Sequence, residues 1–170
     1  MSKMIFHNVL ITLTCIGLVS VSAISSAETF GPFEITESKP ISELWLNAGF
    51  YSYHFQREKG FNNNNYGIGG EYRYSTVSSI VAGSSYNSVR QTSRYAGWFW
   101  HPLALGPVHF GAVVGGVDGY PGVNNGGWFP VVIPAASLEY KSIGANVIFI
   151  PSLKDKVYGA LSVQLKVKVY

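Results

Sequence analysis

Three residues in this sequence, His54, Asn87 and Ser88, are of the types that acyl-transfer chemistry uses. An imidazole can accept a proton, a serine hydroxyl can give one, and an amide can hold the ring in one orientation. The tripeptide Tyr86-Asn87-Ser88 is also a good turn opening, because Asn and Ser side chains bond their own backbone. The residue types alone therefore leave two interpretations open, a turn and a reaction centre.

The elements that must position these residues are predicted to be β-strands. Apolar or aromatic residues alternate with small or polar ones in eight stretches, which are residues 44–55, 66–74, 79–87, 94–103, 108–117, 129–140, 143–150 and 157–169. Such stretches bounded by Gly, Pro, Asn and Ser are typical of strands. No run of residues after the N-terminal region is apolar enough for a spanning helix.

The connections between these stretches alternate in length. Short ones fall at 75–78, 104–107 and 141–142, and long polar ones at 56–65, 88–93, 118–127 and 151–156. This alternation is the habit of outer-membrane barrels, in which long loops face outward and short turns face the periplasm. The predicted fold is therefore all-β, an eight-stranded antiparallel transmembrane β-barrel of the bacterial outer membrane.

In such a barrel the candidate residues converge. His54 is near the far end of the first strand, and Asn87 and Ser88 are at the far end of the third, so all three approach the extracellular rim. His101 and His109, by contrast, fall toward the periplasmic rim. Near the C-terminus, Lys166 and Lys168 are predicted to point into the barrel, because Val163, Leu165 and Val167 share the opposite face.

The N-terminus has the features of a secretory signal. A basic start precedes an apolar run at 9–21, and small residues at 25–27 suit signal peptidase. We expect residues 1–27 to be cleaved, residues 28–43 to form a periplasmic segment and residues 44–170 to form the barrel. The chain's single cysteine, Cys15, would leave with the signal, so no disulfide is expected.

Two other architectures fit the sequence less well than an outer-membrane barrel. A soluble lipid-carrier barrel should be polar on one face of every strand, yet residues 131–136 and 147–150 are apolar on both faces. That pattern favours lipid outside and an acyl-chain cavity inside. A lipoprotein anchored at Cys15 is disfavoured, since Thr14 is not the small residue expected before a lipidated cysteine.

No cofactor, metal or nucleic acid is expected. The chain lacks paired cysteines and metal-spaced histidines, and its glycines are scattered through predicted strands instead of clustering in a phosphate loop. A net charge of +3 is too weak to indicate nucleic-acid binding.

The sequence resembles the outer-membrane lipid A palmitoyltransferases, the PagP family. The segment PVVIPAASLEYKSIGANVIFIP (130–151) is similar to a family run of the form P-V-L-L-P-L-A-S with a later I-P. The family's Asp-Ser pair, its A-G-x-x-W and its R-P-L fall without gaps on Asn87-Ser88, Ala96-Gly97, Trp100 and the Pro102-Leu103 region, and its aromatic-His falls on Tyr53-His54.

The resemblance implies a function and roles for individual residues. Members move a palmitoyl chain from a phospholipid to lipid A, so a phospholipid donor, a lipid A or other lipid acceptor and the barrel assembly machinery are the expected partners. His54, Asn87 and Ser88 would be catalytic, with Asn87 replacing an Asp. Pro134 and Pro151 would weaken one seam as a lateral gate for lipid.

Other departures from the family bear on substrate and activity. Phe99 stands where members have the glycine at the floor of the acyl pocket, which predicts chains shorter than palmitate. The family's second gate aligns with Gly49 and Asn65, which are not prolines. Because Asn87 is neutral and this gate is missing, a non-catalytic small outer-membrane barrel that binds lipid or acyl chains stays open as an alternative.

Overall fold

The computed structural model describes residues 29–152 and 158–170, and eight of its strands close into an antiparallel barrel. The predicted signal peptide lies outside the described residues. The barrel strands are β3 (Pro40–His54), β4 (Asn64–Ser75), β5 (Ser78–Tyr86), β6 (Thr92–Leu105), β7 (Val108–Val117), β8 (Phe129–Tyr140), β9 (Ile143–Ile150) and β10 (Ala160–Lys168). The all-β, eight-stranded prediction is confirmed.

Each barrel strand pairs with its neighbours in sequence, and β3 pairs with β10 to close the ring. Closure removes the free strand edges that would otherwise expose unpaired N–H and C=O groups. A membrane offers no water to satisfy such groups, which is why spanning sheets are closed. Among the described residues, no helix is long and apolar enough to cross a membrane.

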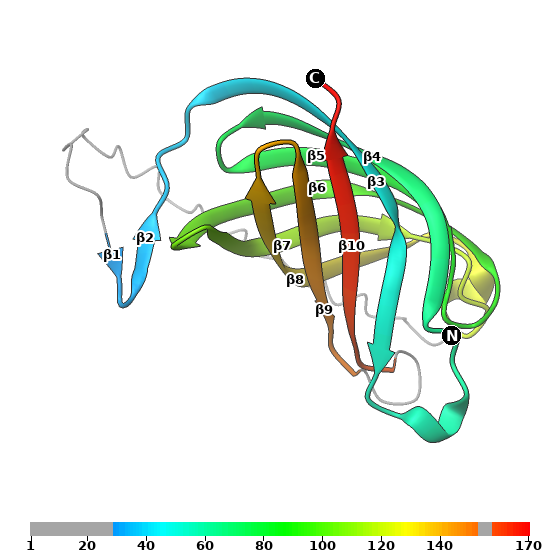
Figure 1. Cartoon of the computed structure of the whole chain (residues 1–170). Helices are drawn as coiled ribbons and strands as arrows, with labels where there is room; N and C mark the ends of the chain where they lie inside the picture. The colour runs from blue at the N-terminus through cyan, green and yellow to red at the C-terminus, as the bar shows by residue number, and fades with distance from the viewer. Residues whose placement is uncertain (1–28, 153–157) are drawn as a thin grey trace, which may run out of the picture.

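The predicted alternation of loop lengths is also confirmed. Two-residue turns join β4 to β5, β6 to β7 and β8 to β9, and Gly106 begins one of them with a φ of +55°. A positive φ is what short hairpin turns require. Figure 1 shows the C-terminus and the turn between β8 and β9 at one end of the barrel, and the η1 segment (Arg57–Lys59) at the other.

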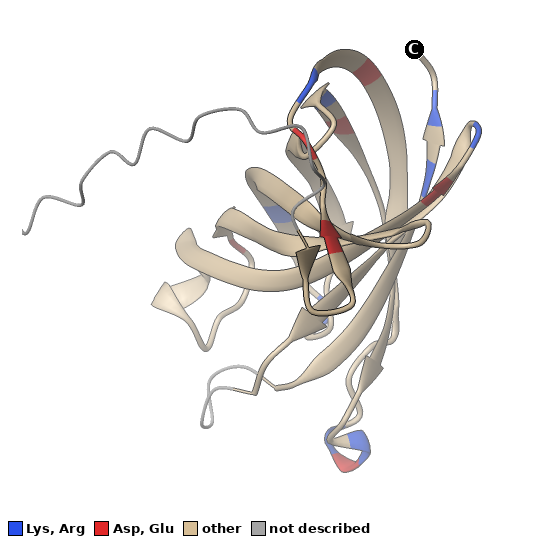
Figure 2. Cartoon of the chain, turned by 90° about the vertical axis from the view of Figure 1, so that its left-hand side faces the viewer, with Lys and Arg blue, Asp and Glu red and all other residues tan. Residues whose placement is uncertain are grey.

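The outer face of the barrel is apolar and aromatic between its ends. Along β10, Leu161, Val163 and Leu165 are exposed, whereas the residues between them are buried inside. Figure 2 shows charged residues gathered near the C-terminal end and in the η1 loop. This distribution places the apolar band where lipid would surround the barrel.

The segment before the barrel forms a small hairpin that pairs with the barrel. β1 (Thr29–Phe30) pairs with β2 (Phe33–Ile35), and β2 pairs with the last residues of β6, which extend past the end of β5. The first barrel strand begins at Pro40, four residues before the predicted boundary at Leu44. The strand can start earlier because Pro40 and Glu43 already pair with β4.

Candidate functional site

His54 faces the barrel interior because β3 contains an irregularity at Gly49. Trp45 and Asn47 point inward before it, and Ser52 and His54 point inward after it, so the inward phase moves by one residue. The pairing of β3 shifts at this point with both β4 and β10. An extra residue in a strand re-aims every side chain that follows it, and here the consequence is an inward His54.

Ser88 and Asn63 hold the two nitrogens of the His54 ring. His54 Nε2 is 2.8 Å from Ser88 Oγ, and His54 Nδ1 is 2.9 Å from Asn63 Oδ1. An amide oxygen can only accept, so Nδ1–H donates to Asn63 and Nε2 is left to accept the Ser88 proton. The three side chains form a hydrogen-bonded chain of the kind that activates a nucleophilic hydroxyl.

An aromatic pair covers the ring from the loop side. The Phe61 and His54 ring centroids are 5.0 Å apart, and Phe61 packs in turn on Tyr158 at 4.9 Å. His54 is 6% exposed as a result, whereas Asn63 is exposed at the rim. The imidazole therefore sits at a boundary between the barrel interior and the surface.

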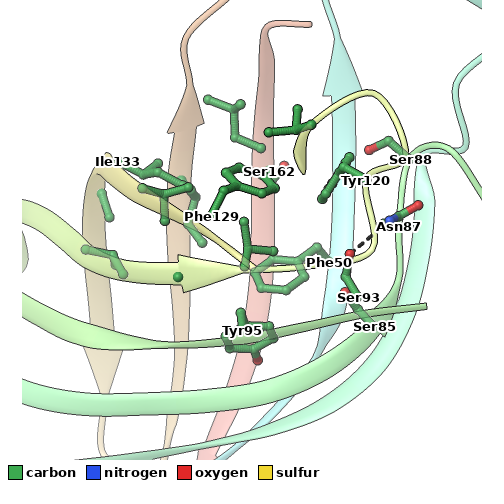
Figure 3. Close-up of a pocket in the computed structure, with 18 of the residues that line it drawn as sticks. Phe50, Ser85, Asn87, Ser88, Ser93, Tyr95, Tyr120, Phe129, Ile133 and Ser162 are labelled. Atoms are coloured by element: carbon green, nitrogen blue, oxygen red, sulfur yellow. Dashed lines mark hydrogen bonds between the residues drawn. The ribbon is translucent and has the colours of Figure 1, made fainter. Parts of the chain in front are cut away.

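Among the described residues Asn87 makes no hydrogen bond to His54, so it does not hold the ring as predicted. Its Nδ2 donates to Ser93 Oγ at 2.8 Å and to the Gly119 carbonyl at 2.7 Å, and its Oδ1 accepts the N–H groups of Val89 and Gln91 at 3.0 Å. Figure 3 shows the bond to Ser93. Asn87 thus builds the turn that the tripeptide predicts, and Ser88 is hydrogen-bonded to the histidine.

Tyr120 is a further polar group at this site that the sequence did not reveal. It extends from the loop after β7, and its hydroxyl lies beside those of Ser88 and Ser93 (Figure 3). Burial raises the pKa of this tyrosine, so its hydroxyl keeps its proton and can donate it to an oxygen. Asn63 was missed as well, because the run Asn62-Asn63-Asn64-Asn65 reads as an ordinary polar loop.

Below the histidine the barrel holds a cavity of about 530 Å³ with mostly apolar walls. Its volume is within the range of small-molecule and cofactor sites, about 300–1,000 Å³. Phe99 is 1% exposed and packs at its inner end with Val81 and Ala135, where a floor was predicted. The expected apolar interior is therefore present in the long-loop half of the barrel.

The seam between β8 and β9 is incomplete beside this cavity. The two strands pair only from Ala135 and Ile148 to Tyr140 and Ile143, although β8 continues to Phe129 and β9 to Ile150. Pro134 is the first β8 residue beyond the ladder, and proline has no N–H to extend it. Pro151 follows β9 and lines the cavity together with Pro130 and Ile133. The two predicted gate prolines thus flank a seam without backbone pairing.

At the other predicted gate the β3–β4 ladder is irregular but continues. Pairing shifts at Gly49 and resumes with Phe50 opposite Asn65. This agrees with the expectation that proline gating is not evident there.

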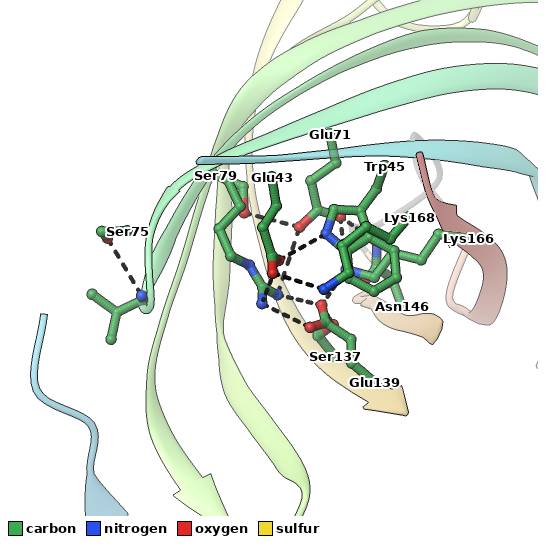
Figure 4. Close-up of polar contacts among 12 residues, drawn as sticks. Glu43, Trp45, Glu71, Ser75, Ser79, Ser137, Glu139, Asn146, Lys166 and Lys168 are labelled. Atoms are coloured by element: carbon green, nitrogen blue, oxygen red, sulfur yellow. Dashed lines mark hydrogen bonds and ion pairs between the residues drawn. The ribbon is translucent and has the colours of Figure 1, made fainter. Parts of the chain in front are cut away.

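The short-turn half of the barrel contains paired charges. The apolar interior expected for an acyl-chain cavity is therefore wrong for this half. Lys166 Nζ is 2.9 Å from Glu71 Oε2 and 2.7 Å from Glu139 Oε1, and Arg73 pairs with Glu139. Ser79 and Asn146 donate to Glu71, and Lys168 pairs with Glu43 (Figure 4). The predicted inward orientation of both lysines is confirmed.

His101 and His109 are not simple rim residues. His101 is fully buried, with its ring centroid 4.6 Å from that of Phe99 and 5.8 Å from that of His109. It points inward by ordinary alternation along β6, in phase with Ser93 and Phe99, and the register of β6 with β7 shifts only beyond it, before Leu103. Within the described ranges, no three His, Cys, Asp or Glu side chains are grouped so that they could hold a metal ion.

Comparison with known proteins bears on the fold alone. No protein-family model matches the sequence, and no curated protein matches it. The chain is similar in structure to a de novo designed transmembrane barrel, TMB2.3, solved by NMR in solution, with a TM-score of 0.54 and 12% sequence identity. The match covers 76% of this chain and 95% of the designed one. By its closed sheet and by this similarity, the chain is an eight-stranded membrane β-barrel in fold.

Proposed function

We propose that the protein is an outer-membrane acyltransferase that moves an acyl chain from a phospholipid to lipid A or another lipid acceptor. One observation carries the proposal: the Ser88–His54–Asn63 chain stands at the mouth of an apolar cavity. The incomplete β8–β9 seam gives a membrane lipid a lateral path to that cavity. The location in the bacterial outer membrane rests on the loop pattern and on the predicted signal peptide.

The geometry supports a transfer in two steps. His54 Nε2 takes the Ser88 proton, and Ser88 Oγ attacks the ester carbonyl of a phospholipid whose acyl chain fills the cavity. The carbon–oxygen ester bond breaks, and the imidazolium returns the proton to the departing lysophospholipid alcohol. The Tyr120 hydroxyl, which is protonated and adjacent to Ser88, would donate to the oxyanion of the intermediate.

The second half-reaction reverses these roles. A hydroxyl of the acceptor lipid gives its proton to His54 and attacks the acyl-Ser88 carbonyl, and Ser88 Oγ then recovers that proton. Asn63 keeps the ring oriented throughout by accepting from Nδ1–H. Because an amide carries no charge, it stabilises the imidazolium less than a carboxylate would, and we expect slow turnover.

The neutral amide also favours a second candidate, a barrel that binds phospholipid without chemistry. In the described structure the His54 ring is held by Asn63 and Ser88, with no carboxylate bonded to either nitrogen. This candidate predicts phospholipid that copurifies with the protein and remains intact.

The test is acyl transfer by purified protein in mixed micelles of phosphatidylcholine and lipid A, followed by mass spectrometry. Wild type should produce lysophosphatidylcholine and lipid A of higher mass. His54→Ala and Ser88→Ala should lower the rate about 10²–10⁴-fold, whereas Ser142→Ala, an exposed serine in the far turn, should not. If the wild-type protein does not raise the mass of lipid A, the acyltransferase proposal is refuted and the lipid-binding barrel is the remaining candidate.

A further inference from the structure

A second cavity touches His54 from outside the barrel wall. It has a volume of about 320 Å³ and is lined by Tyr51, Tyr53, His54, Gln56, Arg57, Phe61 and Asn63. Tyr51 and Tyr53 alternate with the inward residues of β3 and are 61% and 45% exposed, so they lie on the lipid-facing side. We call this cavity the outer pocket. His54 and Phe61 line both the outer pocket and the interior cavity.

The two chambers differ in chemistry. The interior cavity has apolar walls, whereas the outer pocket presents phenol, amide and guanidinium groups. Gln56 Oε1 is buried and accepts no hydrogen bond from the described residues, although its Nε2 donates to Ser152. An unused acceptor of this kind suits a ligand hydroxyl, since a buried oxygen without a partner costs about 1–3 kcal/mol.

Arg57 gives the outer pocket a positive charge at the level of the membrane surface. Its guanidinium donates to Tyr53 Oη and lies 4.6 Å from the centre of the Tyr53 ring. Arg90 bonds the Gly60 carbonyl of the same loop at 3.0 Å, and Lys59 lies over Tyr158. The described segments 57–60 and 88–91 thus carry three cations and one carboxylate, that of Glu58. An exposed guanidinium with free N–H groups is suited to a phosphate.

We propose that the outer pocket is the acceptor site and that it takes a hydroxylated lipid headgroup bearing a phosphate, with Arg57 contacting the phosphate. This inference rests on the acyltransferase function proposed above. The acceptor's chains stay in the membrane against Tyr51 and Tyr53, so only its headgroup needs to enter the pocket. The outer pocket then holds the phosphate end of the headgroup, and the acceptor hydroxyl extends past Phe61, which lines both chambers, to His54 Nε2 and the acyl-Ser88 carbonyl. The donor's acyl chain stays in the interior cavity, so neither lipid has to leave before the other binds.

The experiment compares two acceptor lipids that both have free hydroxyl groups, only one of which carries a phosphate. Phosphatidylcholine serves as donor because it has no free hydroxyl, and phosphatidylglycerol or the uncharged glucosyl diacylglycerol serves as acceptor. The measured quantity is the ratio of kcat/KM for the anionic acceptor to that for the neutral one. Wild type should prefer phosphatidylglycerol, and Arg57→Gln should lower the ratio about tenfold, since a hydrogen bond to a charged group contributes about 1.5–3 kcal/mol.

A matched control removes a similar cation at the opposite end of the barrel. Lys141 lies 5.3 Å from the centre of the Tyr140 ring near a short turn, so Lys141→Gln changes the net charge equally and should leave the ratio unaltered. If Arg57→Gln and Lys141→Gln have the same effect, the outer pocket is not the acceptor site, although donor cleavage would still support the acyltransferase. If wild type releases no lysophosphatidylcholine, both proposals fail.

Discussion

At the scale of residues, the two asparagines near His54 differ because their amide groups meet different partners. Asn63 offers only its oxygen to the ring, whereas Asn87 uses both ends of its amide to hold the 88–91 turn and the Gly119 carbonyl. A carboxylate could replace the amide of Asn63 but not that of Asn87, because a carboxylate lacks N–H donors. In this structure Asn87 therefore supports the turn, and the partner of His54 Nδ1 is Asn63.

The first prediction follows for Asn87→Asp. The new carboxylate would face the Gly119 carbonyl and lose the donation to Ser93, so the free energy of unfolding should fall by about 1–3 kcal/mol without a gain in activity. Denaturant unfolding in micelles measures the first effect and the acyl-transfer assay the second. Asn63→Asp is the matched variant, and it should keep or raise the rate because its oxygens still accept from Nδ1–H. A faster Asn87→Asp enzyme would contradict the expected lack of a gain in activity, and an unchanged free energy of unfolding would contradict the expected loss of stability.

A second prediction concerns Phe99, which is buried at the floor of the cavity. Phe99→Ala should deepen the cavity and shift the preferred donor toward longer acyl chains, by about tenfold between 14 and 16 carbons, since methylene groups in a pocket discriminate at that level. Phosphatidylcholines of defined chain length measure the profile. Trp98→Ala is the control, because Trp98 faces outward. If wild type transfers the 14-carbon and 16-carbon chains equally, Phe99 does not limit the length of the acyl chain.

At the scale of elements, the irregularity at Gly49 decides what β3 presents to the interior. A Cβ at this position would meet the backbone of Asn65, Tyr66 and Gly67 at distances that real contacts do not show. The site therefore depends on a glycine well away from it, at the point where β3 changes phase.

Gly49→Ala is the test of this dependence. The added methyl group should cost about 1–3 kcal/mol of stability, as overpacking does, and should lower transfer activity by disturbing His54. Unfolding in micelles and the assay provide the two measurements. Gly122→Ala is the control, since a Cβ there has open space around it. Unchanged stability in Gly49→Ala would mean that β3 and β4 can shift to make room.

The loop that carries Tyr120 begins with an ion pair whose contribution depends on pH. Asp118 accepts from the Arg94 backbone N–H at 2.6 Å and from Arg94 Nε at 2.8 Å, and these bonds hold the pKa of its carboxyl below the ordinary value. A lowered pKa in the folded state stabilises the protein above the unfolded pKa, near 4, and this stabilisation is lost as the pH falls through the folded value.

We therefore expect Asp118→Asn to be less stable than wild type near pH 7, and the difference to shrink as the pH is lowered below about 4. Unfolding curves of both proteins across this range measure it. A difference that stays constant with pH would show that the carboxyl titrates at its ordinary value, and that the bonds from Arg94 do not favour its ionised form.

At the scale of the whole molecule, the barrel interior is divided into an apolar half and a charged half. Lys166 and Glu71 are fully buried and belong to the charged half, together with Glu139 and Arg73. Buried charges are tolerated only when each has partners. The charged half therefore closes the barrel beneath the cavity and gives the cavity a fixed depth.

Lys166→Met should destabilise the protein by about 3–5 kcal/mol, because it leaves two carboxylates short of a partner. Lys168→Met is the matched control, and it should cost less, since Lys168 and Glu43 are partly exposed. Denaturant unfolding in micelles compares them. The double variant Lys166→Met/Glu71→Met should recover part of the lost stability. If Lys166→Met and Lys168→Met lower the free energy of unfolding equally, the buried charges do not close the barrel as described.

The sequence by itself determined the eight strands, the ends of the barrel at which the loops lie, and the meeting of His54 with Ser88 at one rim. These follow from local alternation and turn residues, which act over a few neighbours. Only the tertiary structure decided that Asn63 and not Asn87 holds the ring, and that Lys166 meets Glu71 inside the barrel. Such contacts depend on a change of phase at Gly49 and on strands far apart in sequence that barrel closure brings together.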